Sequence, residues 1–257
     1  MPDPTPTYAR LEWDKTGERF YETGVEKGVL WVWDKTLNDG AGGWADGVAW
    51  NGLTNVSEKP SGAEPTALYA DDIKYLNLIS NEEFAATIEA YTYPDEFAAC
   101  DGSAQLTAGL SIGQQTRTKF CFCYQTKIGN DTEGNDKGVK YHIVYNCLAA
   151  PTEKGYATIN DSPEAITFSW EISTTPVDVT DYKPTAIVTI DSTKLTDAQI
   201  TALEAALYGN ASGPSTLKTP DQLKTILTGA LSNQTPPPAE GDGETNGETN
   251  GETTGQG

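Results

Sequence analysis

Alternating apolar and polar positions mark three segments of the chain as strands. In residues 118–127, aromatic side chains alternate with Cys121 and Cys123 at the period of two that an extended backbone gives. The same period runs through residues 139–147 and 166–172. Weaker patterns predict further strands at 18–22, 29–33, 48–56, 73–79, 84–92 and 186–190. Many strands, long polar loops and few helical patterns predict a mainly β fold, a β-sandwich or barrel.

Residues 129–138 connect the two strongest strands and consist mostly of turn-forming residues. The segment is too long for a two-residue hairpin, so we expect a projecting loop. It carries Asp131, Glu133 and Asp136, which are candidates for contacts with a neighbouring molecule or for a weak cation site. An EF-hand is excluded, because the sixth and twelfth positions counted from Asp131 hold Asp136 and His142 instead of Gly and Glu.

The composition divides the chain into three regions. Residues 1–182 form the expected β domain, with a short helix expected at 94–99 because Pro94 suits a first helical position. Residues 183–231 form a small helical C-terminal extension, with one strand and two short helices. Residues 232–257 repeat Gly-Glu-Thr-Asn and hold no apolar residue after Ala239, which predicts a disordered acidic tail.

Local signals define the ends of the two helices in the extension. Thr196 and Thr219 are each followed three residues later by Gln, the capping-box pattern that begins a helix. Gly209 and Gly229 follow the apolar stripes and are the expected stops.

The charge is strongly negative, with 37 acidic against 17 basic residues and a net charge of −20. Such a surface does not favour binding to nucleic acid or to an anionic membrane, because both require Lys and Arg. Improved solubility is the alternative explanation of the charge. No stretch approaches the ~20 apolar residues of a membrane span, and the first residues lack the pattern of a signal peptide. We therefore expect synthesis in a cytoplasm.

Four cysteines are present. Cys121 and Cys123 lie two apart in a strand, so their Cα atoms are roughly 6.5–7 Å apart and their side chains are parallel, which disfavours a disulfide between them. The partners of Cys100 and Cys147 cannot be deduced from the sequence. We expect reduced, mostly buried thiols.

Catalytic chemistry has little support in the sequence. His142 is the single histidine and lies in the polar register of a strand with no nucleophile elbow beside it. Cys121-x-Cys123 is not a zinc knuckle, and no phosphate-binding glycine loop occurs. A pair of carboxylates acting as in a glycoside hydrolase is an alternative, but any acidic chain offers such pairs by chance. We therefore expect a protein that is not an enzyme and that uses no cofactor.

Tryptophan is concentrated in residues 31–50. Trp31 and Trp33 share one face of a strand and are expected in the core. Trp44 lies in a glycine-rich segment, where burial requires a partner, and Trp50 lies just beyond it. Both are candidate assembly contacts, because Trp often anchors protein interfaces. The alternatives are that Trp44 is an intramolecular plug, or that these residues belong to a soluble carbohydrate- or cation-binding β module.

Several stretches, in a specific order and spacing, resemble the major tail proteins of long-tailed, non-contractile bacteriophages, the subunits of the tail tube. The resembling segments are 47–53, 60–65, 68–76, 90–97, 129–131, 160–165 and 174–177, followed by 185–193 and the two helices after it, which resemble the C-terminal extension of some members. The acidic repeat of residues 232–257 departs from the family pattern.

The resemblance implies a structural virion protein with a β fold of the tail tube type. It implies hexameric rings of this chain that stack into a tube, contacts with a tape-measure protein and with tail terminator and tip proteins, and DNA that passes through the lumen without specific binding. It transfers no catalytic residue.

Overall fold

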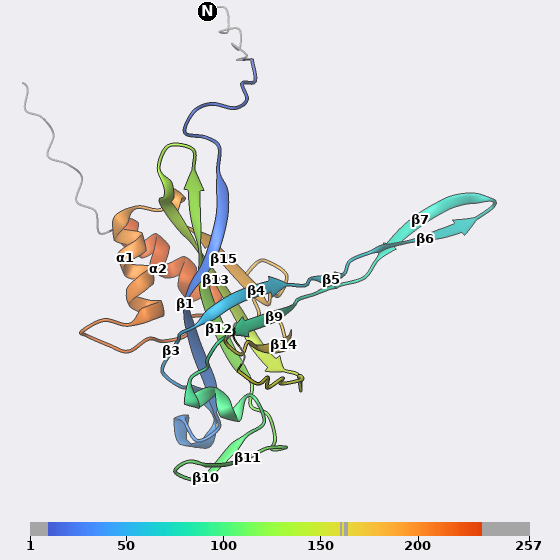
Figure 1. Cartoon of the computed structure of the whole chain (residues 1–257). Helices are drawn as coiled ribbons and strands as arrows, with labels where there is room; N and C mark the ends of the chain where they lie inside the picture. Colours follow the sequence, from blue (N-terminus) through green and yellow to red (C-terminus); the bar gives the residue numbers. More distant parts are fainter. Residues whose placement is uncertain (1–9, 160, 162–163, 233–257) are drawn as a thin grey trace, which may run out of the picture.

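A computed structural model describes residues 10–159, 161 and 164–232 of the chain. The protein is mainly β, with a large antiparallel sheet and a small helical extension (Figure 1). The predicted acidic tail lies outside the described residues, apart from Ser232. None of the helices in the described part of the chain is long and apolar enough to span a membrane.

The largest sheet has nine strands in the order β2-β1-β12-β13-β14-β9-β4, with β3 also paired to β1 and β15 to β13. Its strands are β1 (Tyr21–Asp34), β2 (Gly43–Trp44), β3 (Val48–Trp50), β4 (Leu53–Glu58), β9 (Ala85–Ala90), β12 (Phe120–Asn130), β13 (Gly134–Ala149), β14 (Phe168–Thr174) and β15 (Ile187–Asp191).

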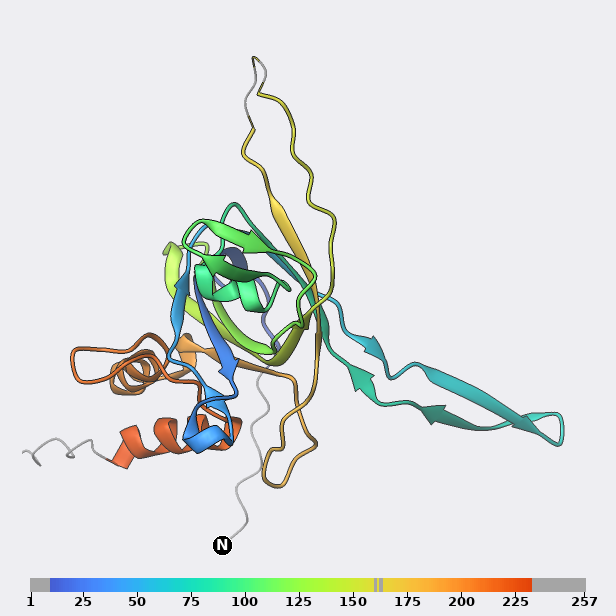
Figure 2. The ribbon, with the colours of Figure 1, turned by 90° about the horizontal axis from the view of Figure 1, so that it is seen from below.

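The sheet curls into a barrel around an aromatic core. Leu30, Phe122, Trp170 and Ile88, from four different strands, are fully buried in one cluster together with Trp50. Figure 2 shows the round cross-section of this body. The barrel closes where β1 approaches the start of β4: a Cβ atom on Gly28 would lie 2.7 Å from Leu53 Cδ1. A side chain at residue 28 would therefore separate the two strands.

The helical extension covers the outer face of the same sheet. Leu203 and Leu207 of α1 (Asp197–Tyr208) and Leu223 of α2 (Pro220–Ser232) pack with Cys123 and Tyr141 in a second buried cluster. Both faces of β12 are consequently buried. The extension also adds β15 to the edge of β13, so it shares a sheet with the β domain.

The helix starts are as predicted, but one stop is wrong. Thr196 and Gln199 exchange the two capping-box hydrogen bonds, and Thr219 and Gln222 do the same. Gly209 follows the end of α1 with φ 76°. Helix α2, in contrast, continues past Gly229 to Ser232. At 94–99 the expected helix is the 3-10 helix η2 (Asp95–Ala99); η1 (Asn38–Gly40) and η3 (Ser192–Lys194) were not expected.

The strand boundaries differ from the expectation where the backbone turns left-handed. The expected strands at 18–22 and 29–33 are one strand, β1, with bulges near Gly24 (φ 70°) and Lys27 (φ 51°). Gly52 (φ 78°) divides the segment 48–56 into β3 and β4. In β13, a bulge at Asn146 (φ 47°) interrupts the alternation, so Tyr145 lies in the outer cluster and Cys147 in the inner one.

The projecting loop expected at 129–138 is wrong. Strands β12 and β13 continue through this segment, and only residues 131–133 lie between them. The Asn130 side-chain oxygen accepts hydrogen bonds from the backbone N–H groups of Thr132 (3.2 Å) and Glu133 (2.6 Å). This Asx turn reverses the direction of the chain in a short space. The turn-forming residues therefore make a tight hairpin turn instead of a projecting loop.

Two long excursions leave the barrel instead, in different directions (Figure 2). The first is a two-stranded arm of β6 (Pro65–Ala70) and β7 (Ile73–Ile79) on a narrow base of β5 (Ser61–Gly62) and β8 (Glu82–Glu83). The second lies between β13 and β14. A smaller hairpin, β10 (Ala104–Thr107) and β11 (Leu110–Ile112), crosses one end of the barrel.

Candidate assembly surface

The arm is an isolated antiparallel ribbon that reaches far from the barrel (Figure 1). Asp71 and Asp72 form its tip with φ angles of 51° and 62°, the left-handed pair that a tight hairpin turn needs. Every residue of β7 is exposed. Two strands alone are marginally stable in water, so an arm of this length is expected to gain stability from a second surface.

One face of the arm is apolar. Cross-strand pairing places Leu68 opposite Leu76, and Leu78 and Ile73 lie on the same face at either side of this pair. Their exposed fractions are 41% for Leu68, 39% for Leu76, 55% for Leu78 and 64% for Ile73. The opposite face is mixed, because Lys74 and Asn77 share it with Tyr69 and Ile79, which are 73% and 68% exposed. A continuous apolar strip on a projecting element is typical of a protein contact surface.

A polar cluster lies at the root of the arm, where β4 ends. The Glu58 carboxylate accepts a hydrogen bond of 2.6 Å from the Tyr124 hydroxyl. The His142 ring stacks on the Tyr124 ring, with centroids 4.6 Å apart and planes 3° from parallel. His142 Nδ1 lies 3.3 Å from Glu58 Oε1, close enough for an ion pair although the two groups are not aligned for a hydrogen bond. Glu58 is thus held by side chains from β12 and β13.

The electrostatics of this cluster favour an ionised Glu58. The His142 imidazole and the Tyr124 hydroxyl beside the carboxylate lower the pKa of Glu58, although partial burial opposes them. Burial, and then the Glu58 carboxylate, raises the pKa of the Tyr124 phenol. Tyr124 therefore remains a hydrogen-bond donor, and Glu58 an acceptor, at neutral pH.

The cluster has the connectivity of a hydroxyl–histidine–carboxylate triad, because Thr126 Oγ1 lies 3.2 Å from His142 Nε2. Other parts of such a site do not accompany it. Thr126 lies within a regular strand and pairs with Lys140, so its backbone is used in the ladder and not in a nucleophile elbow. Neither of two surface cavities, of about 260 and 640 Å³, is lined by Thr126, His142 or Glu58. The geometry suits a structural contact.

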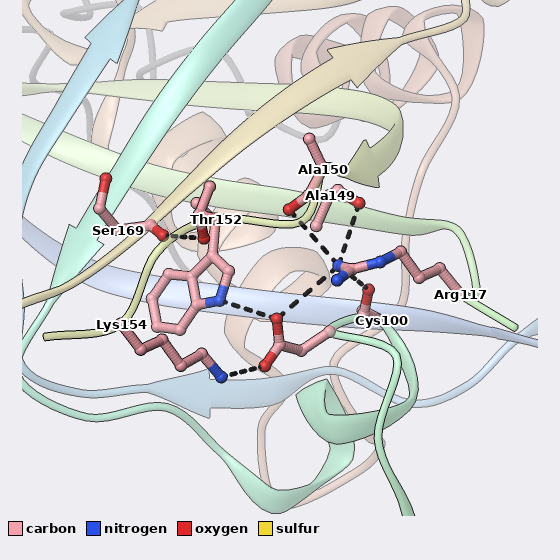
Figure 3. Close-up of polar contacts among 9 residues, drawn as sticks. Cys100, Arg117, Ala149, Ala150, Thr152, Lys154 and Ser169 are labelled. Atoms are coloured by element: carbon pink, nitrogen blue, oxygen red, sulfur yellow. Dashed lines mark hydrogen bonds and ion pairs between the residues drawn. The ribbon is translucent and has the colours of Figure 1, made fainter. Parts of the chain in front are cut away.

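A second polar cluster holds the root of the second excursion (Figure 3). The Asp101 side chain is only 6% exposed and pairs with Lys154 and with Arg117, whose Nη1 lies 3.7 Å away. It also accepts a hydrogen bond of 3.2 Å from the Trp170 indole N–H. Arg117 Nη1 further donates to the backbone oxygens of Cys100 and Ala149.

This cluster ties together segments that are distant in the sequence. Asp101 follows η2, Lys154 lies at the start of the excursion, and Trp170 is in β14. Burial lowers the pKa of the Lys154 ammonium, but the neighbouring Asp101 carboxylate more than offsets this, and the pKa is raised. Two cations around one carboxylate compensate the cost of its burial. Beyond this root, Tyr156 and Ile159 are 74% and 86% exposed.

The structure places the two tryptophan candidates in different environments. Trp50 is 2% exposed and packs on Phe97, Phe122 and Trp170, while its indole N–H donates to Thr92 O. A neighbouring subunit cannot reach this side chain unless the core opens. Trp44 is half-buried on the short strand β2, where its ring packs at 5.1 Å on Trp33. The partner that burial of Trp44 requires is thus Trp33 on the paired strand β1, while a contact of the exposed edge of Trp44 with another subunit stays a prediction.

Two of the three acidic candidates, Asp131 and Glu133, have partners within the chain. Asp131 accepts a hydrogen bond from the Gly17 N–H (2.9 Å) and lies 3.9 Å from Arg19, so it holds the N-terminal segment on the hairpin. Glu133 pairs with Lys137, and Asp136 is exposed beside it. Their use in assembly stays a prediction. Within the described residues, no group of three or more His, Cys, Asp or Glu side chains is arranged to hold a metal ion.

The four cysteines are free and buried, as expected. Burial raises the pKa of Cys100 and of Cys121 to about 12, and it also raises the pKa of Cys123 and of Cys147 well above the usual range of a thiol. A thiol with such a pKa is protonated at neutral pH and is a poor nucleophile.

Comparisons with known proteins find similarity in structure but not in sequence. No family model matches the chain, and no curated protein matches it. Among solved structures, a chain of the cryo-EM structure of the anti-feeding prophage baseplate, symmetrised six-fold, is similar with a TM-score of 0.34 and 10% identity. The match covers 72% of this chain and 100% of that chain. A likeness of this size is too small to indicate a shared function.

Proposed function

We propose that this chain is a structural virion protein, the tail tube subunit of a long-tailed, non-contractile bacteriophage. Copies of the chain form hexameric rings, the rings stack into a tube, and the lumen conducts DNA to the host cell. The resemblance of the sequence segments between residues 47 and 193 is the reason for naming this family.

The exposed arm is the structural observation that supports the proposal of self-assembly. Its apolar face, formed by Leu68, Ile73, Leu76 and Leu78, has no partner among the described residues beyond its own two strands. Covering such a strip with a second copy stabilises both molecules by about 25 cal/mol for each Å² of apolar surface removed from water. We take the second copy of the chain as the partner because a homo-oligomer supplies one arm and one receiving surface per subunit.

The charge of the chain fits a conduit for DNA. A net charge of −20 repels a polyanion, so DNA in transit would not be held by the wall. In this proposal the further partners are a tape-measure protein within the lumen and terminator and tip proteins at the ends of the tube. The protein acts without a cofactor.

Negative-stain electron microscopy of the purified protein tests the proposal. We expect rings or tubes of regular width from the wild-type chain. Leu78→Asp places a charge on the apolar face and should abolish them, whereas Asn77→Asp places the same charge one residue away on the opposite face and should not. A wild-type protein that stays monomeric at high concentration, and that binds a glycan on an array, would contradict the proposal and favour a carbohydrate-binding module.

A further inference from the structure

Two short chain segments connect the arm to the barrel, and a hydrogen bond holds each of them to the sheet. On the outgoing side, the backbone N–H of Lys59 donates to Ala85 O at 2.7 Å, directly after Glu58. On the returning side, the hydroxyl of Thr174 donates to Phe84 O at 2.6 Å. Both hydrogen bonds lie within or beside the plane of the sheet, so they fix the place where the arm begins. They restrict a tilt of the arm out of this plane less strongly.

The Glu58 side chain supplies a contact of another kind. Strand β4 pairs with β9, whereas Tyr124 and His142 belong to β12 and β13, which β4 does not pair with. The hydrogen bond from Tyr124 to Glu58 therefore crosses the barrel interior from the end of β4. A contact outside the plane of the sheet resists the tilt that the ladder hydrogen bonds permit.

We propose that Glu58, Tyr124 and His142 are positioning residues that set the direction in which the arm leaves the barrel. The biological role of this latch rests on the proposed function, because the direction of the arm decides where its apolar face meets a second copy. The latch itself is a property of the single subunit and can be measured without assembly.

The length of the arm makes the direction at its root important. Residues 58 to 71 lie along one side of the arm, and at about 3.3 Å per residue they extend roughly 40 Å from the latch to the tip. A tilt of about 10° at the root then moves the tip by roughly 7 Å, more than the spacing of neighbouring strands. The apolar face would miss a surface that it otherwise meets.

Electron–electron distance measurement on the full-length chain tests the latch. One nitroxide is attached at Asn77→Cys on the arm and a second at Thr201→Cys on α1; both positions are exposed. The native thiols should not take up label, because they are buried. The protein is kept at a concentration at which it is monomeric, so the measurement does not depend on assembly.

We expect one narrow distance distribution for the parent protein and a broadening of about twofold in Glu58→Ala and in Tyr124→Phe. Glu58→Gln keeps an acceptor oxygen for the Tyr124 hydroxyl and should restore most of the narrow distribution. Glu64→Ala removes the same charge from an exposed position within the arm and is the matched control. Its distribution should not change.

Two results would overturn the proposal. One is an unchanged distribution in both Glu58→Ala and Tyr124→Phe while the melting temperature falls, which would make the cluster a stabilising contact only. The other is an equally broad distribution in the parent protein. A parent protein with a narrow distribution that never forms rings would instead contradict the proposed function and leave the latch supported.

Discussion

At the scale of single residues, the barrel depends on a few polar side chains placed among aromatic ones. Asp101 is an example, because its carboxylate is almost fully buried and accepts from Trp170 while it pairs with Lys154 and Arg117. Removing one member of such a cluster leaves the others buried without a partner, which costs more than the contact itself contributes. Asp101 should therefore be sensitive to substitution.

We expect Asp101→Ala to lower the free energy of unfolding by about 3 kcal/mol, since two cations and an indole N–H lose their acceptor. Urea denaturation followed by tryptophan fluorescence measures this change. Glu96→Ala, an exposed acid in η2 five residues away, should change the free energy of unfolding by less than about 0.5 kcal/mol. If both substitutions changed the free energy of unfolding equally, Asp101 would contribute to stability only through its negative charge.

At the scale of elements, the arm and the barrel have separate roles. The arm contributes no residue to the buried clusters, whose members all lie outside 59–83. The barrel should fold without it.

Replacing residues 63–81 by a short glycine-containing turn should leave the melting temperature of the barrel within about 3 °C of the wild type. Assembly should be lost, because the apolar face is removed. Differential scanning calorimetry and sedimentation velocity measure the two effects. A barrel that no longer folds would show that the arm stabilises its own subunit, and assembly without the arm would remove it from the interface.

The sequence predicts the elements whose signals are local. Alternation located β12 correctly because aromatic residues face the inner cluster while Cys121 and Cys123 face the outer one. The capping pairs at Thr196 and Thr219 each act within four residues. The bulge at Asn146 is not predicted, because apolar and polar residues still alternate in the sequence at this point, although the bulge turns Tyr145 and Cys147 to opposite faces of the sheet.

The polar clusters could not be predicted, because their contacts are distant in the sequence. Glu58 is 66 residues from Tyr124, and Asp101 is 69 from Trp170. The charge of Asp131 is evident from the sequence, but its hydrogen-bond partner Gly17 lies 114 residues earlier. β6, the partner of β7 in the arm, was missed for a different reason: Pro65–Ala70 is short and its alternation is weak.

At the scale of the whole molecule, the negative charge is shared between the body and the tail. The tail carries five of the 37 acidic residues and no basic residue. Its repeats offer no apolar side chain that could offset the entropy lost on ordering. Assembly through the arm should therefore not require it.

Deleting residues 236–257 should leave assembly intact, with rings or tubes of the same width in negative stain. The truncated protein keeps both helices of the extension, so its melting temperature should also be unchanged. Loss of assembly would mean that the tail contributes a contact of its own.

The direction of the arm also bears on how many copies can close a ring. In the proposed rings, the apolar face of one arm meets a different surface of the next copy, so each contact is head-to-tail and repeats until the accumulated rotation returns to its start. Six copies require a rotation of about 60° per step and seven about 51°. The two rotations differ by only about 9°, so in the proposed tube the direction of the arm at the end of β4 bears on the copy number, and with it on the bore of the tube.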